Sequence, residues 1–191
     1  MTEKALPQFI HHESSPVGNI LLAADEVGLT GLWFEGQKNY ARTLFPESGE
    51  RELPVFRQAK HWLEVYFAGK EPAFSVPLHP MGTAFQQRVW DFLRTIPYGN
   101  TATYGEIAKR LAAENGLAHL SAQAIGGAVG RNPISILIPC HRVIGADGSL
   151  TGYAGGIGRK RALLTLEREG VVNAAEAIPQ AAQQRSRMRQ P

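Results

Sequence analysis

A proline-rich stretch from Lys70 to Gly82 divides the sequence into two halves with different apolar patterns. It carries Pro72, Pro77 and Pro80, and proline disfavours a helical conformation both for itself and for the residue before it. Short apolar runs broken by turn residues precede the stretch, whereas apolar residues at helical spacing follow it. We therefore expect an N-terminal α/β domain over residues 1–80, linker included, and a mostly helical C-terminal domain over residues 81–172.

The N-terminal half contains the pattern of one hairpin and one helix. Apolar runs at 19–24 and 29–34 flank the turn sequence Asp25-Glu26-Val27-Gly28, which predicts a β-hairpin. Pro54 then opens a segment with apolar residues near helical spacing, and Gly69 stands where a left-handed cap would end a helix. The recurring residues are Phe56, Ala59, Leu63, Tyr66 and Phe67. One helix on a small sheet fits this order.

Helix-capping signals mark the C-terminal half. Thr83 and Gln86 form a capping-box pattern before an apolar helical face that Pro97 ends. Thr103 and Glu106 repeat the pattern and open a second helix, which we expect to end near residue 113. These signals predict two capped helices before residue 115.

The third helix, predicted from Ser121 to Val129, is nearly bare of large side chains. Its small residues are Ala122, Ala124, Gly126, Gly127 and Ala128, and each glycine costs about 1 kcal/mol relative to alanine in a helix. Close approach of the backbone to another surface would offset that cost. Composition alone leaves two explanations open: tight packing on a neighbouring helix, which it favours, or a helix lying in a DNA groove.

The chain after this helix is predicted to pass from a strand to a last helix. The apolar run Ile134 to Ile138 predicts a short buried strand that leads directly into Pro139-Cys140-His141-Arg142-Val143. Asp147-Gly148 predicts a turn, and an amphipathic helix is expected from residue 159 to 169, closing at Gly170. The Ala-, Gln- and Arg-rich tail, residues 173–191, is predicted to be disordered.

Cys140 is the only cysteine in the chain, so an internal disulfide and a multi-cysteine zinc site are excluded. A thiol next to a histidine suggests a nucleophile, because a neighbouring base can generate the reactive thiolate. The alternative is a small buried structural cysteine, since adjacent residues on an extended strand point in opposite directions. These residues alone leave both interpretations open.

The segment from Pro139 to Val143, preceded by Asn132-Pro133, resembles the active-site signature of the O6-alkylguanine-DNA alkyltransferases. The resemblance covers roughly residues 83–170 and includes further motifs in order. They are Tyr104-Gly105-Glu106, Gly126-Gly127-Ala128, Gly152-Tyr153-Ala154-Gly155-Gly156 and Leu163-Leu164 to Glu167. It implies a ribonuclease-H-like N-terminal domain and a winged helix-turn-helix C-terminal domain that enters the minor groove. It therefore favours the DNA-groove explanation of the third helix.

The same resemblance implies direct-reversal DNA repair. The alkyl group, mainly methyl, on guanine O6 would move irreversibly to Cys140 after the base is flipped out of the duplex. His141 would activate the thiol through a bridging water, with Glu167 orienting the imidazole and Asn132 bracing the turn. The thioether is stable, so each molecule would act once. O4-alkylthymine stays open as a secondary substrate, and no metal or other cofactor is implied.

The resemblance also implies which residues bind the substrate. Val143, Tyr153 and Ala154 would line the base pocket, and Tyr104 would crowd the phosphate of the flipped nucleotide. Gln123 stands where the family often has arginine to fill the vacated stack, and glutamine lacks that charge and stacks less well. The DNA-binding residues expected in full are Thr103, Gln123, Ala124, Gly127 and Arg131.

Several of these assignments have structural alternatives. Tyr104 is otherwise a first-turn aromatic packed on the core, Gln123 a solvent-facing helix residue, and Glu167 a helix-surface charge. Arg142 is expected to be a structural donor rather than a catalytic group. The formal net charge of +3 and the pI of about 9.2 permit a basic DNA-facing surface. Its expected phosphate contacts are Arg131, Arg159, Lys160 and Arg161.

The sequence has no apolar stretch long enough to cross a bilayer and no signal-peptide pattern in residues 1–16, so we expect a cytoplasmic protein. We expect a monomer that binds double-stranded DNA containing alkylated guanine, with no obligate protein partner. Two alternatives remain. One is a non-catalytic lesion sensor, against which the presence of Cys140 argues. The other is a thiol hydrolase of acyl substrates, which would turn over and would need an oxyanion hole.

Overall fold

The N-terminal half of the chain forms a small twisted sheet in the computed structural model, which describes residues 6–177. Its strands are β1 (Phe9–Glu13), β2 (Ile20–Ala24), β3 (Leu29–Phe34) and β4 (Gly49–Glu50), in the order β3-β2-β1-β4. The pairs β1–β2 and β2–β3 are antiparallel, and the short β4 is parallel to β1. The predicted hairpin is confirmed as β2 and β3.

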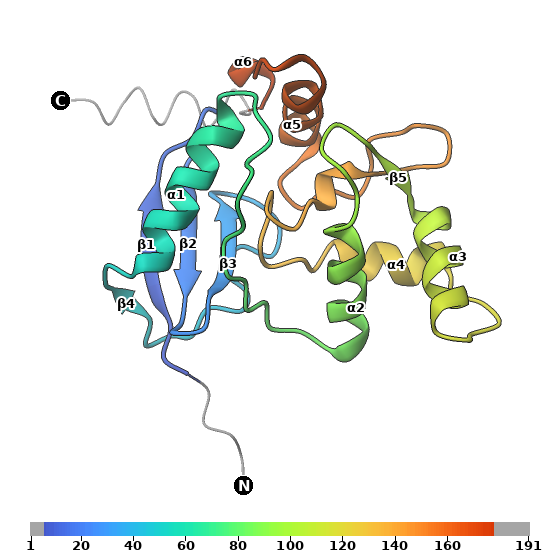
Figure 1. Cartoon of the computed structure of the whole chain (residues 1–191), viewed down its shortest axis with the longest axis horizontal. Helices are drawn as coiled ribbons and strands as arrows, with labels where there is room; N and C mark the ends of the chain where they lie inside the picture. The colour runs from blue at the N-terminus through green and yellow to red at the C-terminus, as the bar shows by residue number, and fades with distance from the viewer. Residues whose placement is uncertain (1–5, 178–191) are drawn as a thin grey trace, which may run out of the picture.

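Helix α1 (Pro54–Phe67) lies across one face of this sheet (Figure 1). Pro54 stands at the start of the helix, where its missing N–H costs nothing, and the left-handed Gly69 (φ +76°) follows its end. The buried face of α1 is made by Phe56, Ala59, Leu63 and Tyr66, as the spacing predicts. A smaller cluster of Leu21, Ala23 and Trp33 covers the other face.

The C-terminal half is built on helices that begin at the predicted caps. Both capping boxes form: Thr83 opens α2 (Ala84–Leu93) and Thr103 opens α3 (Tyr104–Glu114). Ser121 caps α4 (Ala122–Val129), and the longer α5 (Ile157–Glu169) ends at the left-handed Gly170. Two short strands, β5 (Ala102–Thr103) and β6 (Val143–Ile144), pair in parallel and join the start of α3 to the segment after Arg142. An α/β half followed by a mostly helical half is the predicted fold class.

The predicted strand from Ile134 to Ile138 is wrong. Only Ile134 makes an isolated bridge, with Leu32, and the following residues turn through Ile136, whose φ is +68°. The turn forms because backbone groups pair inside it, Ile138 N donating to Ile134 O at 3.1 Å. The chain then enters a single 3-10 turn, η1 (Cys140–Arg142), and not an extended segment. Apolar composition alone did not distinguish a buried turn from a buried strand.

Both the linker and the segment before Cys140 lie along the free edge of β3. Leu29 N donates to Pro77 O at 2.9 Å, and Leu32 N donates to Pro133 O at 2.8 Å. One apolar core consequently runs through both halves of the molecule. The boundary expected at residues 80–81 stays a prediction. The sheet edge fixes where the Cys140 turn stands relative to α1.

The first residues of the tail that was predicted to be disordered are ordered. Residues 174–177 form a short helix, α6 (Ala174–Ala177), packed on α5, and Ala177 is buried. The rest of the predicted tail, residues 178–191, lies outside the described residues. Within residues 6–177, no helix has the length and apolar character that crossing a bilayer requires.

Candidate active site

Asn132 holds the turn that carries Cys140. Its Nδ2 donates to Ile138 O at 2.8 Å and to Ile134 O at 3.2 Å, and its Oδ1 accepts from Ile134 N at 2.9 Å. The same Nδ2 lies 3.1 Å from Cys140 Sγ. The asparagine therefore fixes the turn and also presents a hydrogen-bond donor to the sulfur, where the amide would stabilise a thiolate.

Cys140 is nearly enclosed, with 4% of its surface exposed. Burial raises the pKa of the thiol to about 11, although the Asn132 hydrogen bond and the Lys160 ammonium both oppose that rise. The sulfur is therefore a thiol at neutral pH. A reaction at this sulfur needs a base that takes its proton during the reaction.

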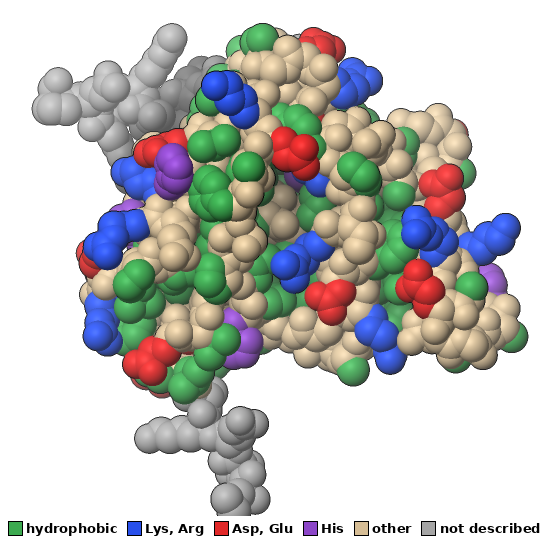
Figure 2. Space-filling view, viewed as in Figure 1, with side chains coloured by type: hydrophobic (Ala, Val, Ile, Leu, Met, Phe, Trp, Pro, Cys, Tyr) green, Lys and Arg blue, Asp and Glu red, His purple; other side chains and the backbone are tan. Residues whose placement is uncertain are grey.

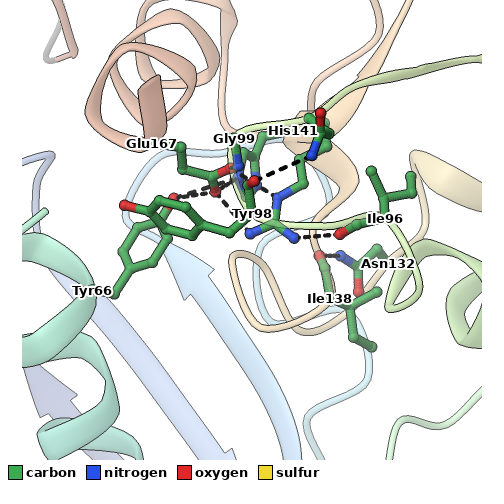
Figure 3. Close-up of polar contacts among 10 residues, drawn as sticks. Tyr66, Ile96, Tyr98, Gly99, Asn132, Ile138, His141 and Glu167 are labelled. Carbon is green, nitrogen blue, oxygen red and sulfur yellow. Dashed lines mark hydrogen bonds and ion pairs between the residues drawn. The ribbon is translucent and has the colours of Figure 1, made fainter. Parts of the chain in front are cut away.

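A buried histidine–glutamate pair stands beside the cysteine. His141 Nε2 lies 2.6 Å from Glu167 Oε1, and both side chains are fully buried (Figure 3). Glu167 also accepts two hydrogen bonds from the Arg142 guanidinium, at 2.9 and 3.0 Å, and one from Gly99 N at 3.0 Å. Tyr66 of α1 donates to Glu167 Oε1 at 2.8 Å. The alternative that Glu167 is a helix-surface charge is wrong.

These contacts decide which nitrogen of His141 is the base. Burial by itself raises the pKa of Glu167, but His141 and Arg142 outweigh burial and lower that pKa to about 2. Burial lowers the pKa of His141, against the opposing effect of Glu167. The imidazole is therefore neutral, and its Nε2–H points at an ionised carboxylate. Its Nδ1 is buried with no protein partner among the described residues, and this leaves it free to accept a proton.

Two of the expected phosphate contacts are structural. Lys160 is fully buried, and its Nζ donates to Val143 O at 2.5 Å and Thr151 O at 2.8 Å. Arg159 is 7% exposed and donates to carbonyls of the N-terminal half, including Val17 O at 2.9 Å. The expectation that these two cations face DNA is therefore wrong. Arg131 and Arg161 are exposed, as DNA contacts require.

A hollow of about 500 Å³ opens between the two halves of the molecule, and Cys140 is not among its lining residues. Tyr153 and Ala154 line it, together with the glycines of α4. Val143 is fully buried and is not among the lining residues, and Tyr104 donates its hydroxyl to Thr151 O at 3.1 Å. The φ of Gly152 is +76°, and a Cβ there would lie 2.6 Å from the Tyr104 hydroxyl. Glycine at 152 therefore lets the tyrosine approach this loop.

The N-terminal half supplies one wall of this hollow, which the sequence did not reveal. Lys38, Asn39 and Arg42 line it. Lys38 N donates to Ala154 O at 3.0 Å, and Asn39 Nδ2 donates to Gly130 O at 3.2 Å. No local motif marks these residues, because their place in the wall depends on partners about a hundred positions away.

Helix α4 uses its small residues on two faces. On one, Trp90 Nε1 of α2 donates to Ala128 O at 3.0 Å, which is the tight helix packing that composition favoured. On the other, Gln123, Ala124, Gly127 and Arg131 line an open hollow of about 440 Å³. Thr103 lies apart from this hollow and caps α3. On the face shown in Figure 2, acidic and basic side chains are interspersed and do not form one basic patch.

Comparison with known proteins agrees with this geometry. Residues 10–80 match the family model described as the ribonuclease-like domain of 6-O-methylguanine DNA methyltransferase. Residues 84–169 match the model of its DNA binding domain. A methylated-DNA–protein-cysteine methyltransferase of Methanosarcina acetivorans is 49% identical over 80% of this chain and 94% of its own length. The same-named protein of Mycobacterium bovis is 48% identical over 83% and 93%.

Solved structures agree as well. The crystal structure of Mycobacterium tuberculosis OGT in complex with DNA matches with a TM-score of 0.76 and 44% identity, over 88% of this chain and 98% of that one. The O6-methylguanine methyltransferase structure from the same organism matches with a TM-score of 0.70 and 46% identity, over 84% and 93%. By its two matched domains and these relatives, this chain belongs to the 6-O-methylguanine DNA methyltransferase family.

Proposed function

We propose that this protein repairs DNA by moving the alkyl group on O6 of guanine to the sulfur of Cys140. The observation that carries the proposal is the position of the only cysteine: its sulfur lies 3.1 Å from an asparagine amide, beside a buried His–Glu pair. Relatives with 45–49% identity are named methylated-DNA–protein-cysteine methyltransferases. One neighbour was solved in complex with DNA, which supports DNA as the partner, and we propose that the partner is double-stranded.

The proposed reaction moves one proton and one alkyl group. His141 Nδ1 takes the proton from Cys140 through a bridging water, while Glu167 stabilises the imidazolium that forms. The thiolate attacks the alkyl carbon, so a C–S bond forms as the C–O6 bond breaks and its electron pair stays on guanine. The proton then passes from the His141 imidazolium to the departing guanine, which leaves as the neutral base. The product thioether offers water no leaving group, so each molecule acts once.

The substrate contacts are proposed from the two hollows. Tyr153, Ala154 and Tyr104 bind the flipped guanine at the larger hollow, with Val143 supporting it from behind. Gln123 fills the stack that the base leaves, and it is exposed on the open face of α4 as this role requires. Ala124, Gly127 and Arg131 contact the backbone of the duplex on that face, and Thr103 contacts it at the start of α3. Lys38 and Arg42 add positive charge beside the larger hollow.

The finer assignments follow from this reaction. We propose O6-alkylguanine, mainly O6-methylguanine, as the substrate, with O4-alkylthymine as a secondary one. A monomer is sufficient, because every group that the mechanism uses comes from one chain. We also propose a cytoplasmic location, as the sequence predicts. The ribonuclease-like domain at residues 1–80 and the DNA-binding domain at residues 81–172 are proposed as the two units.

Intact-mass measurement after mixing with a duplex containing O6-methylguanine tests the proposal. We expect a gain of one methyl group on the peptide that contains Cys140, in equimolar proportion to the lesion. The Cys140→Ser protein is the control and should stay unmodified while still binding the duplex. An unmodified wild-type protein contradicts the proposal, and continued turnover without a protein adduct would point to the hydrolase alternative.

A further inference from the structure

Tyr66 belongs to the N-terminal half, yet its hydroxyl reaches the carboxylate behind the catalytic histidine. The O–H donates to Glu167 Oε1 at 2.8 Å, across 101 positions of sequence, and lies 3.4 Å from His141 Nε2 (Figure 3). The side chain is fully buried on α1. A helix residue that the apolar spacing assigns to the core therefore also contacts the proposed proton relay.

The ring of Tyr66 is held in place by its neighbours. It stacks on Trp62, with ring centroids 5.3 Å apart, and meets Phe67 and Tyr98 edge-on at 5.4 and 6.0 Å. Burial, followed by the charge of Glu167, raises the pKa of the Tyr66 hydroxyl well above its usual value. The phenol is therefore protonated at neutral pH, and there it can only donate to the carboxylate.

The shared acceptor oxygen links Tyr66 to the basicity of His141. Oε1 of Glu167 accepts from Tyr66, from His141 Nε2 and from the Arg142 guanidinium, whereas Oε2 is occupied by Arg142 and the Gly99 backbone. Each donor withdraws negative charge from the oxygen it binds. A donor lost from Oε1 would leave more charge facing the imidazole, and this favours the imidazolium.

We propose that Tyr66 is a positioning residue for alkyl transfer: by hydrogen-bonding Glu167 Oε1, its hydroxyl keeps His141 neutral and ready to accept the Cys140 proton. The N-terminal half thereby takes part in the chemistry through a residue that is proposed to contact neither the Cys140 sulfur nor the flipped guanine. The inference rests on the proposed function. The titratable and charged groups around His141 and Glu167 are Tyr66 of α1, Lys160 of α5, Cys140 and Arg142 of η1, and Tyr98 and Tyr153 of the loops.

The test compares the full-length wild-type protein with three variants in which only a phenol changes. Tyr66→Phe removes the donor and keeps the ring. Tyr98→Phe is the matched control, because the Tyr98 hydroxyl is buried without a partner among the described residues and its ring touches Tyr66. The third variant carries 3-fluorotyrosine at position 66, whose more acidic phenol is a stronger donor of similar shape.

The first readout is the proton resonance of His141 Nε2–H in protein labelled with 15N-histidine, assigned by its loss in His141→Gln. We expect Tyr66→Phe to move it downfield, because the His141–Glu167 hydrogen bond strengthens when its competitor is removed. We expect 3-fluorotyrosine to move it upfield and Tyr98→Phe to leave it unchanged. This measurement needs no DNA, so it can fail while the methyl transfer of the proposed function succeeds, and the reverse.

The second readout is the pH dependence of the single-turnover rate on a duplex containing O6-methylguanine. We expect the acid limb of the Tyr66→Phe protein to lie about 0.5 to 1 pH unit above that of wild type, a three- to tenfold lower rate on that limb. An unchanged resonance in folded Tyr66→Phe protein overturns the proposal, as does an equal shift in Tyr98→Phe. If Tyr66→Phe does not fold, the fluorotyrosine protein tests the proposal instead. A His141 Nε2–H resonance that stays in place or moves downfield in that protein overturns the proposal.

Discussion

Replacing Glu167 with glutamine should destabilise the protein far more than a single charge change usually does. The carboxylate is fully buried and pairs with Arg142, His141, Tyr66 and the Gly99 backbone. An amide of the same shape would turn two N–H groups toward donors and leave the Arg142 guanidinium without its counter-charge. Breaking a buried pair from one side costs about 3–5 kcal/mol.

The pKa of Glu167 supplies an independent magnitude. Its fall from 4.5 to about 2 corresponds to about 3 kcal/mol of stabilisation at neutral pH. The folded-state pKa is the lower one, so this stabilisation is fully present above pH 4.5 and is lost as the pH falls toward 2. We therefore expect Glu167→Gln to lower Tm by roughly 10 °C at pH 7, at about 2–4 °C per kcal/mol for a chain of this size.

Urea unfolding followed by circular dichroism, at pH 7 and at steps down to pH 3, measures the difference in the free energy of unfolding between Glu167→Gln and wild type. Glu169→Gln on the same helix is the matched control, since Glu169 is exposed and its ion pair with Arg168 spans 3.7 Å. We expect the control to stay within about 0.5 kcal/mol of wild type. The reasoning is refuted if Glu167→Gln lies within 1 kcal/mol of wild type at pH 7, or if the difference does not shrink as the pH falls.

Three further predictions concern the reaction, the backbone and DNA. Because His141 takes the proton during the reaction, the single-turnover rate should vary less than about twofold between pH 7 and 9; a tenfold rise per unit would show that Cys140 ionises unaided to its pKa of about 11. Gly69→Ala should cost at least about 2 kcal/mol in urea unfolding, since a left-handed φ of +76° is combined with a backbone clash against the end of α5, whereas Gly36→Ala (φ +74°, with open space) should cost about 1 kcal/mol. Arg131→Ala should lower by about one the slope of log affinity against log salt on duplex DNA, and an unchanged slope would remove Arg131 from the interface.

The local elements of this fold were predictable because their causes lie within a few residues. The capping boxes at Thr83 and Thr103 form as their sequences indicate, and the hairpin and α1 stand where turn residues and Pro54 place them. In each case a side chain satisfies a backbone group three residues away, or a ring fixes one dihedral angle. These elements can therefore be predicted without knowing how distant parts of the chain pack.

The predictions that were wrong depended on surroundings that the sequence does not state. An apolar run such as Ile134 to Ile138 suits any buried conformation, and the Asn132 side chain together with the edge of β3 selects a turn. A basic residue such as Lys160 suits solvent or DNA unless carbonyl groups enclose it, and here two of them do. Burial is a property of the packed molecule, so residue type alone did not reveal it.

By itself the sequence determined the caps, the helices, the hairpin, the lone thiol and, through its motifs, the family of this protein. Only the tertiary structure decided that Glu167 is a buried acceptor, that Tyr66 donates to it from the other half of the chain, and that Lys38 and Arg42 border the larger hollow. The physical reason is distance along the chain. Hydrogen bonds between residues about a hundred positions apart exist only after both halves have packed onto one core, and no local pattern encodes them.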